Sequence, residues 1–250
     1  MTIDEILEKI KEDKLLEAMV TDLKGKKIHF RILQENKQFT AVGLQLKQAR
    51  EFDEAERIFK TMLDRGETSS ATRNNYGAVL LDDIFSKLRE DGSVDPGRID
   101  EARMQIFEAC NFDKKVSLGW PAAPAYKNLC FLRNVEAYFR YSKGDFLGAF
   151  VLGWISIEMT LHRIWFQYLQ KNSSSILNEQ VLCKKLMSWS VQDISEVLFK
   201  TQIIDSKVRK SLSDLRTIRN KLVHGEINDP TKKNAEECVI VGYNLIPILQ

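Results

Sequence analysis

The chain has 250 residues, of which 44% are hydrophobic and 29% charged, a composition ordinary for a water-soluble globular protein. Its formal net charge is only +2, so no overall field draws the molecule to nucleic acid or to an anionic membrane. Residues 1–14 are charged throughout and lack the apolar core of a secretory signal. We therefore expect a cytoplasmic protein with no membrane association, whose nucleic-acid contacts, where they exist, come from a local basic patch.

Helical periodicity dominates the chain and predicts an all-α fold. Strand-like alternation occurs only at 27–33, within an N-terminal lead-in that we assign to residues 1–38. Residues 39–117 have the pattern of helical hairpins: Gly43 and Leu46 recur as Gly77 and Leu80, both shifted by 34 residues. That period and the small residues, which let two helices cross closely, resemble tetratricopeptide repeats. The resemblance implies a surface that binds a protein partner.

The second half predicts a helical bundle over residues 125–250, after a Pro-rich linker at 118–124. Helical patterns cover 126–141, 145–170, 179–200, 206–223 and 234–249, that is, four principal helices and a smaller one. The second of these is the most apolar part of the chain. Its apolar run is interrupted by charged residues, so it predicts a buried core helix rather than a membrane span. We expect Trp120, Trp154, Trp165 and Trp189 to lie in the core.

The helix 205–223 carries an arginine in an unusual place. At about 100° per residue, its apolar side chains form one stripe, and Arg219 projects inside that stripe. A buried guanidinium must be paired or must line a cavity, because an isolated buried charge is too costly. Asn220 and His224 lie on a different arc, one turn apart, and Gly225 predicts the end of the helix. The stripe comprises Val208, Leu212, Leu215, Ile218, Leu222 and Val223.

A partner for Arg219 is predicted in the apolar helix. Glu158 is the one acidic residue between Asp145 and Glu179, and His162 follows it one turn later. Two lone opposite charges in apolar stripes predict an ion pair between Glu158 and Arg219. Taken from the pattern alone, a pair that fixes helix register is favoured over a functional pair.

These residues together resemble a known family. Segment 219–225 reads Arg-Asn-Lys-Leu-Val-His-Gly, and the apolar segment 150–158 before it ends in a glutamate. This arrangement is similar to that of the HEPN domain. The resemblance implies a four-helix bundle that often forms a homodimer and, in many members, cleaves RNA without a metal. It implies catalytic roles for Arg219, Asn220 and His224, supporting roles for Glu158 and His162, and RNA contacts from Arg216 and Lys221.

The residue types suit that chemistry. Histidine titrates near neutral pH and can move a proton at a ribose hydroxyl or at the leaving oxygen. Arginine can hold a phosphate and stabilise the charge that develops on it. One departure is Glu226, which stands where some family members carry a tyrosine that is modified. Glu226 can also repel phosphate, and non-catalytic family members exist.

No cofactor or metal is predicted. The cysteines Cys110, Cys130, Cys183 and Cys238 lie far apart and are interpreted as reduced core thiols. A metal site built from Glu158, His162 and His224 is disfavoured, and the glycines form no phosphate-binding loop. Two hypotheses remain: a metal-independent endoribonuclease, for which a defence or toxin-like setting stays open, and a non-catalytic adaptor that binds RNA or protein.

Overall fold

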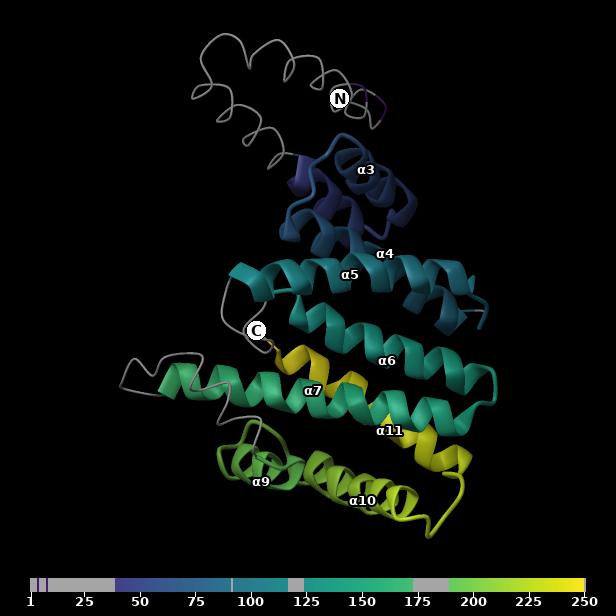
Figure 1. Cartoon of the computed structure of the whole chain (residues 1–250), viewed down its shortest axis with the longest axis vertical. Helices are drawn as coiled ribbons and strands as arrows, with labels where there is room; N and C mark the ends of the chain where they lie inside the picture. Colours follow the sequence, from purple (N-terminus) through teal and green to yellow (C-terminus); the bar gives the residue numbers. More distant parts are fainter. Residues whose placement is uncertain are drawn as a thin grey trace. The chain divides into compact units, whose positions relative to one another are not determined.

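The computed structural model describes residues 4, 8, 39–90, 92–116, 124–172 and 189–249. These residues form helices and turns and no strand, which confirms the all-α prediction for them (Figure 1). The predicted strand-like segment 27–33, most of the lead-in 1–38 and the linker residues 118–123 lie outside the described residues. The chain divides into two compact units, one of Met1–Ser86 with Pro96–Ala109 and one of Lys87–Asp95 with Cys110–Gln250. None of the described helices is long and apolar enough to cross a membrane.

Unit 1 contains a helical stretch at 39–48, α3 (Phe52–Asp64) and most of α4 (Ser70–Glu90) and α5 (Pro96–Val116). Two glycines mark its close helix crossings. A Cβ at Gly43 would come 2.7 Å from the ring of Phe59, and one at Gly77 would come 2.5 Å from Ile106. Both distances are far below van der Waals contact, so both positions require glycine. Gly43 and Gly77, which are 34 residues apart in the sequence, thus have the same packing role: each lets a side chain of another helix approach its backbone closely.

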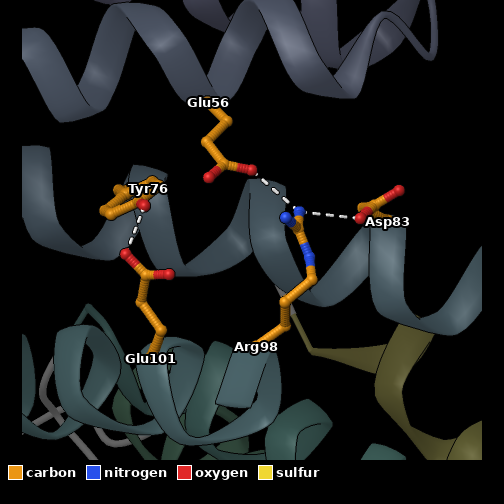
Figure 2. A network of polar contacts seen from close by, with 5 residues as sticks. All are labelled: Glu56, Tyr76, Asp83, Arg98 and Glu101. Atoms are coloured by element: carbon orange, nitrogen blue, oxygen red, sulfur yellow. Dashed lines mark hydrogen bonds and ion pairs between the residues drawn. The ribbon is translucent and has the colours of Figure 1, made fainter. Parts of the chain in front are cut away.

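A network of polar side chains ties the three helices of unit 1 together. Figure 2 shows the Arg98 guanidinium of α5 between Glu56 of α3 and Asp83 of α4, each 2.8 Å from Arg98 Nη2. Burial alone lowers the pKa of Arg98, but its hydrogen bonds and charge attraction to Glu56 and Asp83 outweigh that effect and raise it. Asp83 is almost fully buried, so its ion pair with this guanidinium offsets part of the cost of burying its carboxylate.

The same network includes a buried tyrosine. The Tyr76 hydroxyl donates a hydrogen bond to Glu101 Oε1 over 2.5 Å, which links α4 to α5 a second time (Figure 2). Burial, followed by the hydrogen bond to Glu101, raises the pKa of Tyr76. The core of unit 1 is therefore specified by directional polar contacts as well as by apolar packing.

Unit 2 is built around three helices: α6 (Tyr126–Ser142), α7 (Phe146–Asn172) and α11 (Lys232–Leu245). Small and polar residues lie at their crossings. Gly153 of α7 lies against Cys238 of α11, where an added Cβ would be 3.1 Å from the sulfur. The side-chain amide of Asn134 in α6, which is fully buried, donates a hydrogen bond of 2.9 Å to the Val239 carbonyl oxygen of α11. The remaining elements are α9 (Val191–Lys200), α10 (Ser206–Val223) and a final 3-10 turn, η2 (Ile246–Ile248).

The buried thiols and tryptophans test the predicted core. Cys110, Cys130 and Cys238 are buried and free, and burial raises the pKa of Cys130 to about 12; Cys183 lies outside the described residues. Trp154 and Trp165 are buried as predicted. Trp189 is 40% exposed, so the prediction that it lies in the core is wrong. It directly precedes the cap of α9 and packs one face on Trp165, at 5.1 Å between ring centroids, while the rest of its ring reaches solvent. Trp120 is not among the described residues.

Candidate functional site

The helix α10 carries the predicted motif at its C-terminal end. It starts at Asp205, whose side chain accepts a hydrogen bond from the Val208 backbone N–H over 2.8 Å. Leu212 and Leu215 are buried and hold the helix in the bundle, where it packs mainly on α9 and α11. The anchored first three turns thus fix the position of the last turn.

Gly225 ends the helix and determines how His224 is presented. Its φ of +71° is the left-handed conformation that favours glycine. Two backbone hydrogen bonds close the end: the Gly225 N–H donates to the Leu222 carbonyl over 3.2 Å and the Glu226 N–H to the Lys221 carbonyl over 2.9 Å. His224 is the capping residue, its own N–H bonded to the Asn220 carbonyl over 2.9 Å. Its backbone is therefore fixed while its side chain is exposed.

Arg219 lies one turn before His224 and is half-buried. Its Nη1 lies 3.4 Å from the Asn220 Oδ1, and it forms no ion pair with any described residue. The predicted apolar stripe is correct for Leu212 and Leu215 but wrong for Val223, which is 63% exposed. Because the last turn of α10 is only partly covered, water can reach the guanidinium, so it does not require a buried counter-ion.

Glu158 and His162 lie on α7 and are both half-buried. The predicted ion pair between Glu158 and Arg219 does not occur in the structure, in which both residues are described. The physical reason is packing: α7 makes its main contacts with α6 and α11, whereas α10 packs on α9 and α11. His162 Nδ1 lies 2.8 Å from the Glu158 carbonyl oxygen, which can only accept, so Nδ1 carries the proton. His162 Nε2 is buried and has no hydrogen-bond partner among the described residues.

The two residues predicted to contact RNA differ in their surroundings. Arg216 is half-buried and donates a hydrogen bond to Gln192 of α9, whereas Lys221 is exposed. Part of the basic excess on α10 is neutralised locally, because Arg209 pairs with Glu196 at 2.8 Å and Lys210 with Asp214 at 3.0 Å. In the C-terminal turn of α10, by contrast, Arg219 and Lys221 form no ion pair with a described residue, so the positive charge of this turn is not neutralised locally.

A groove that the sequence did not indicate runs beside the same helix. It has a volume of about 990 Å³ and lies between α10 and α11, with Val208 and Ser211 on one wall and Ile240 and Asn244 on the other. Neither Arg219 nor His224 lines it. Sequence periodicity gives the buried face of each helix but not the gap left between two of them, so no signal in the sequence could have located this groove.

Within the part of the chain that the structure describes, no group of three or more His, Cys, Asp or Glu side chains is arranged to hold a metal ion. The structure brings Arg219 and Asn220 together and presents His224 one turn further on, but it does not bring Glu158 or His162 into hydrogen-bond or ion-pair contact with them. Comparison with models of protein families, with curated proteins and with solved structures found no match.

Proposed function

We propose that unit 2 is an RNA-processing domain of the HEPN type and acts as a metal-independent endoribonuclease. One observation carries the proposal: Arg219 has no carboxylate partner among the described residues, although it sits one turn from an exposed histidine. Other arginines of the chain are neutralised, for example Arg98 by Glu56 and Asp83, and Arg133 by Glu136 at 2.7 Å. A half-buried guanidinium without a counter-ion is suited to binding a phosphate.

The proposed reaction is attack of a ribose 2′-hydroxyl on the adjacent phosphorus. His224 accepts the hydroxyl proton as the new oxygen–phosphorus bond forms. Arg219 stabilises the charge on the phosphate oxygens, and Asn220 holds the guanidinium or contacts the substrate. The bond to the 5′-oxygen breaks and that oxygen takes a proton, which leaves a 2′,3′-cyclic phosphate and a free 5′-hydroxyl. Arg216 and Lys221 would contact neighbouring phosphates.

The reaction needs an acid as well as a base, and one chain offers one histidine at the end of α10. A homodimer that joins two copies of this end would supply the second, and we include that dimer in the proposal. The helical hairpins of unit 1, with their tetratricopeptide-like spacing, would bind the protein that recruits or restrains the nuclease.

A second candidate is an adaptor that binds RNA without cleaving it. It is favoured by one feature of the site: the exposed His224 side chain has no hydrogen-bond partner among the described residues, so nothing there orients its imidazole. Glu158 and His162, the predicted supporting residues, do not supply that contact.

Incubation of the purified full chain with a mixture of single-stranded RNAs in excess chelator separates the two candidates. The wild type should produce fragments ending in cyclic phosphate, and His224→Ala should lose at least about 100-fold in rate, the usual contribution of a proton-transferring side chain. Arg219→Gln should lose a comparable factor because the phosphate charge is no longer stabilised.

Lys207→Ala is the matched control, since it removes an exposed cation from the opposite end of the same helix. It should cleave like the wild type. RNA binding without cleavage by the wild-type dimer would favour the adaptor, and equal cleavage by wild type and His224→Ala would reject the proposed catalytic role.

A further inference from the structure

A cluster of aromatic rings lies where the turn between α6 and α7 meets the start of α11. We refer to Tyr138, Tyr141 and Phe146 as the aromatic patch; all three are half-buried. The ring centroids of Tyr138 and Tyr141 are 6.5 Å apart with a 19° angle between planes, and those of Tyr141 and Phe146 are 5.8 Å apart and tilted by 54°. These rings are grouped at a helix end and are not covered by a core, so part of their surface is open to a ligand.

Two lysines lie near these rings. Lys232 Nζ is 6.0 Å from the centroid of Tyr141. Lys143, in the turn between α6 and α7, lies with its Nζ 5.6 Å from the centroid of Phe139. Both lysines are exposed, and neither forms an ion pair with a described residue.

Two carboxylates lie nearby. Asp145 pairs with Arg140 at 3.2 Å, and the charge of Glu236 contributes, after burial, to raising the pKa of Tyr141. The aromatic patch therefore combines exposed ring surface with two exposed lysines, neither of which forms an ion pair with a described residue.

We propose that the aromatic patch, with Lys143 and Lys232, binds single-stranded RNA through its unpaired bases. Stacking on an aromatic ring needs a free base face and is tolerant of sequence, and cations beside the rings bind the connecting phosphates. A duplex hides its base faces, so it would gain only the phosphate contacts.

The place of the aromatic patch in unit 2 relates it to the proposed nuclease site. The end of α10, the start of α11 and the α6–α7 turn all lie at the same end of the bundle in Figure 1, and the contact of Lys232 with Tyr141 joins the last two. Only residues 225–231 separate His224 from α11. The inference rests on the proposed action on RNA and deepens it: the aromatic patch would hold the unpaired strand whose phosphate reaches Arg219.

The test measures binding alone, in the full chain carrying His224→Ala, so that cleavage is not the readout. Fluorescence anisotropy is followed with a labelled oligoadenylate of roughly 12 nucleotides, within the site sizes of single-strand binders. Tyr141→Leu keeps an apolar contact to Phe146 but removes the ring, and should weaken binding about tenfold. Tyr141→Phe keeps the ring and should bind as the parent does.

A second set of variants keeps the test valid if Tyr141→Leu does not fold. Lys143→Gln combined with Lys232→Gln should weaken binding and reduce its salt dependence, whereas Lys207→Gln, an exposed lysine away from the aromatic patch, should not. Unchanged affinity in a folded Tyr141→Leu, or equal affinity for a duplex RNA of the same length, overturns the inference. If Tyr141→Leu loses binding and the wild type does not cleave RNA, the aromatic patch is supported and the nuclease is rejected. If Tyr141→Leu binds normally and the wild type cleaves RNA, the nuclease is supported and the role of the aromatic patch is rejected.

Discussion

Arg98 connects three helices with one side chain, and its partner Asp83 is almost fully buried. We expect Arg98→Met to lower the free energy of unfolding by about 2–4 kcal/mol, somewhat below the cost of breaking a fully buried pair, because Arg98 is 26% exposed. Urea denaturation followed by circular dichroism measures the loss. Arg103→Met, which removes an exposed pair with Asp100 on the same helix, should cost less than about 1 kcal/mol. Equal losses in the two variants would contradict the assignment of Asp83 as dependent on Arg98.

Tyr126 links stability to alkaline pH. It is 6% exposed, and burial, followed by the charges of Cys130 and Cys110, raises its pKa above the ordinary value near 10.0. Since the folded chain keeps this proton while the unfolded chain releases it, the contribution of Tyr126 is fully present below pH 10 and is lost as the pH rises further. Between pH 10 and 11 the free energy of unfolding should fall by about 1 kcal/mol less in Tyr126→Phe than in the wild type.

Urea titrations at several pH values measure that difference as a change of slope. Tyr243→Phe is the matched control for loss of a hydroxyl, because its side chain is 37% exposed. Parallel pH profiles for Tyr126→Phe and the wild type would show that this hydroxyl does not carry the linkage.

At the scale of the element, the end of α10 depends on one backbone conformation. Gly225→Ala places a Cβ in the left-handed region and should destabilise the chain by about 1 kcal/mol. It should also loosen the last turn that presents His224. Gly225→Asn should cost less, because asparagine tolerates this conformation better than alanine does. Thermal unfolding ranks the three proteins; alanine and asparagine variants of equal stability would indicate that the φ of Gly225 is not the limiting feature.

The helices themselves were predictable where local signals are strong. Segment 206–223 coincides with α10 because Asp205 and Gly225 fix its two ends. The last helix was predicted to run to 249, but α11 ends at Leu245 and a 3-10 turn follows, because Pro247 cannot continue the α-helical hydrogen bonds. The start of α9 after the Ser190 cap was not predicted. A capping box involves only a few residues, so it is a weaker signal than the helical periodicity of the apolar residues around it.

The residues of the candidate site come from the sequence pattern, but their contacts could not be predicted from it. Periodicity places Arg219 in a stripe, yet it does not say which helix faces that stripe or where coverage ends. The predicted ion pair with Glu158 is wrong because α10 packs mainly on α9 and α11. The predicted burial of Val223 is wrong because the last turn of α10 is only partly covered. Asn220, adjacent in sequence, makes the contact instead. The aromatic patch was not predicted because its rings come from both α6 and α7, and the lysine nearest to Tyr141 comes from α11.

At the scale of the whole molecule, each unit has its own core and should respond separately to a change within it. Arg98→Met should speed amide hydrogen exchange in 39–86 and 96–109, where its partners lie, and leave exchange in α6, α7 and α11 at the wild-type rate. Mass spectrometry of peptic fragments resolves the two sets. Faster exchange of equal size in both units would contradict independent cores.

The division of the chain also has a consequence for where it can be cut. The second unit is made of Lys87–Asp95 and Cys110–Gln250, so it is discontinuous in sequence and includes the ends of α4 and α5. A truncated protein that begins in the segment 117–123 would keep Arg219 and His224 but lack both of those helix ends. A chimera that joins the N-terminal part of another protein to this chain at one point would also divide a unit, because the stretches of the two units alternate along the sequence.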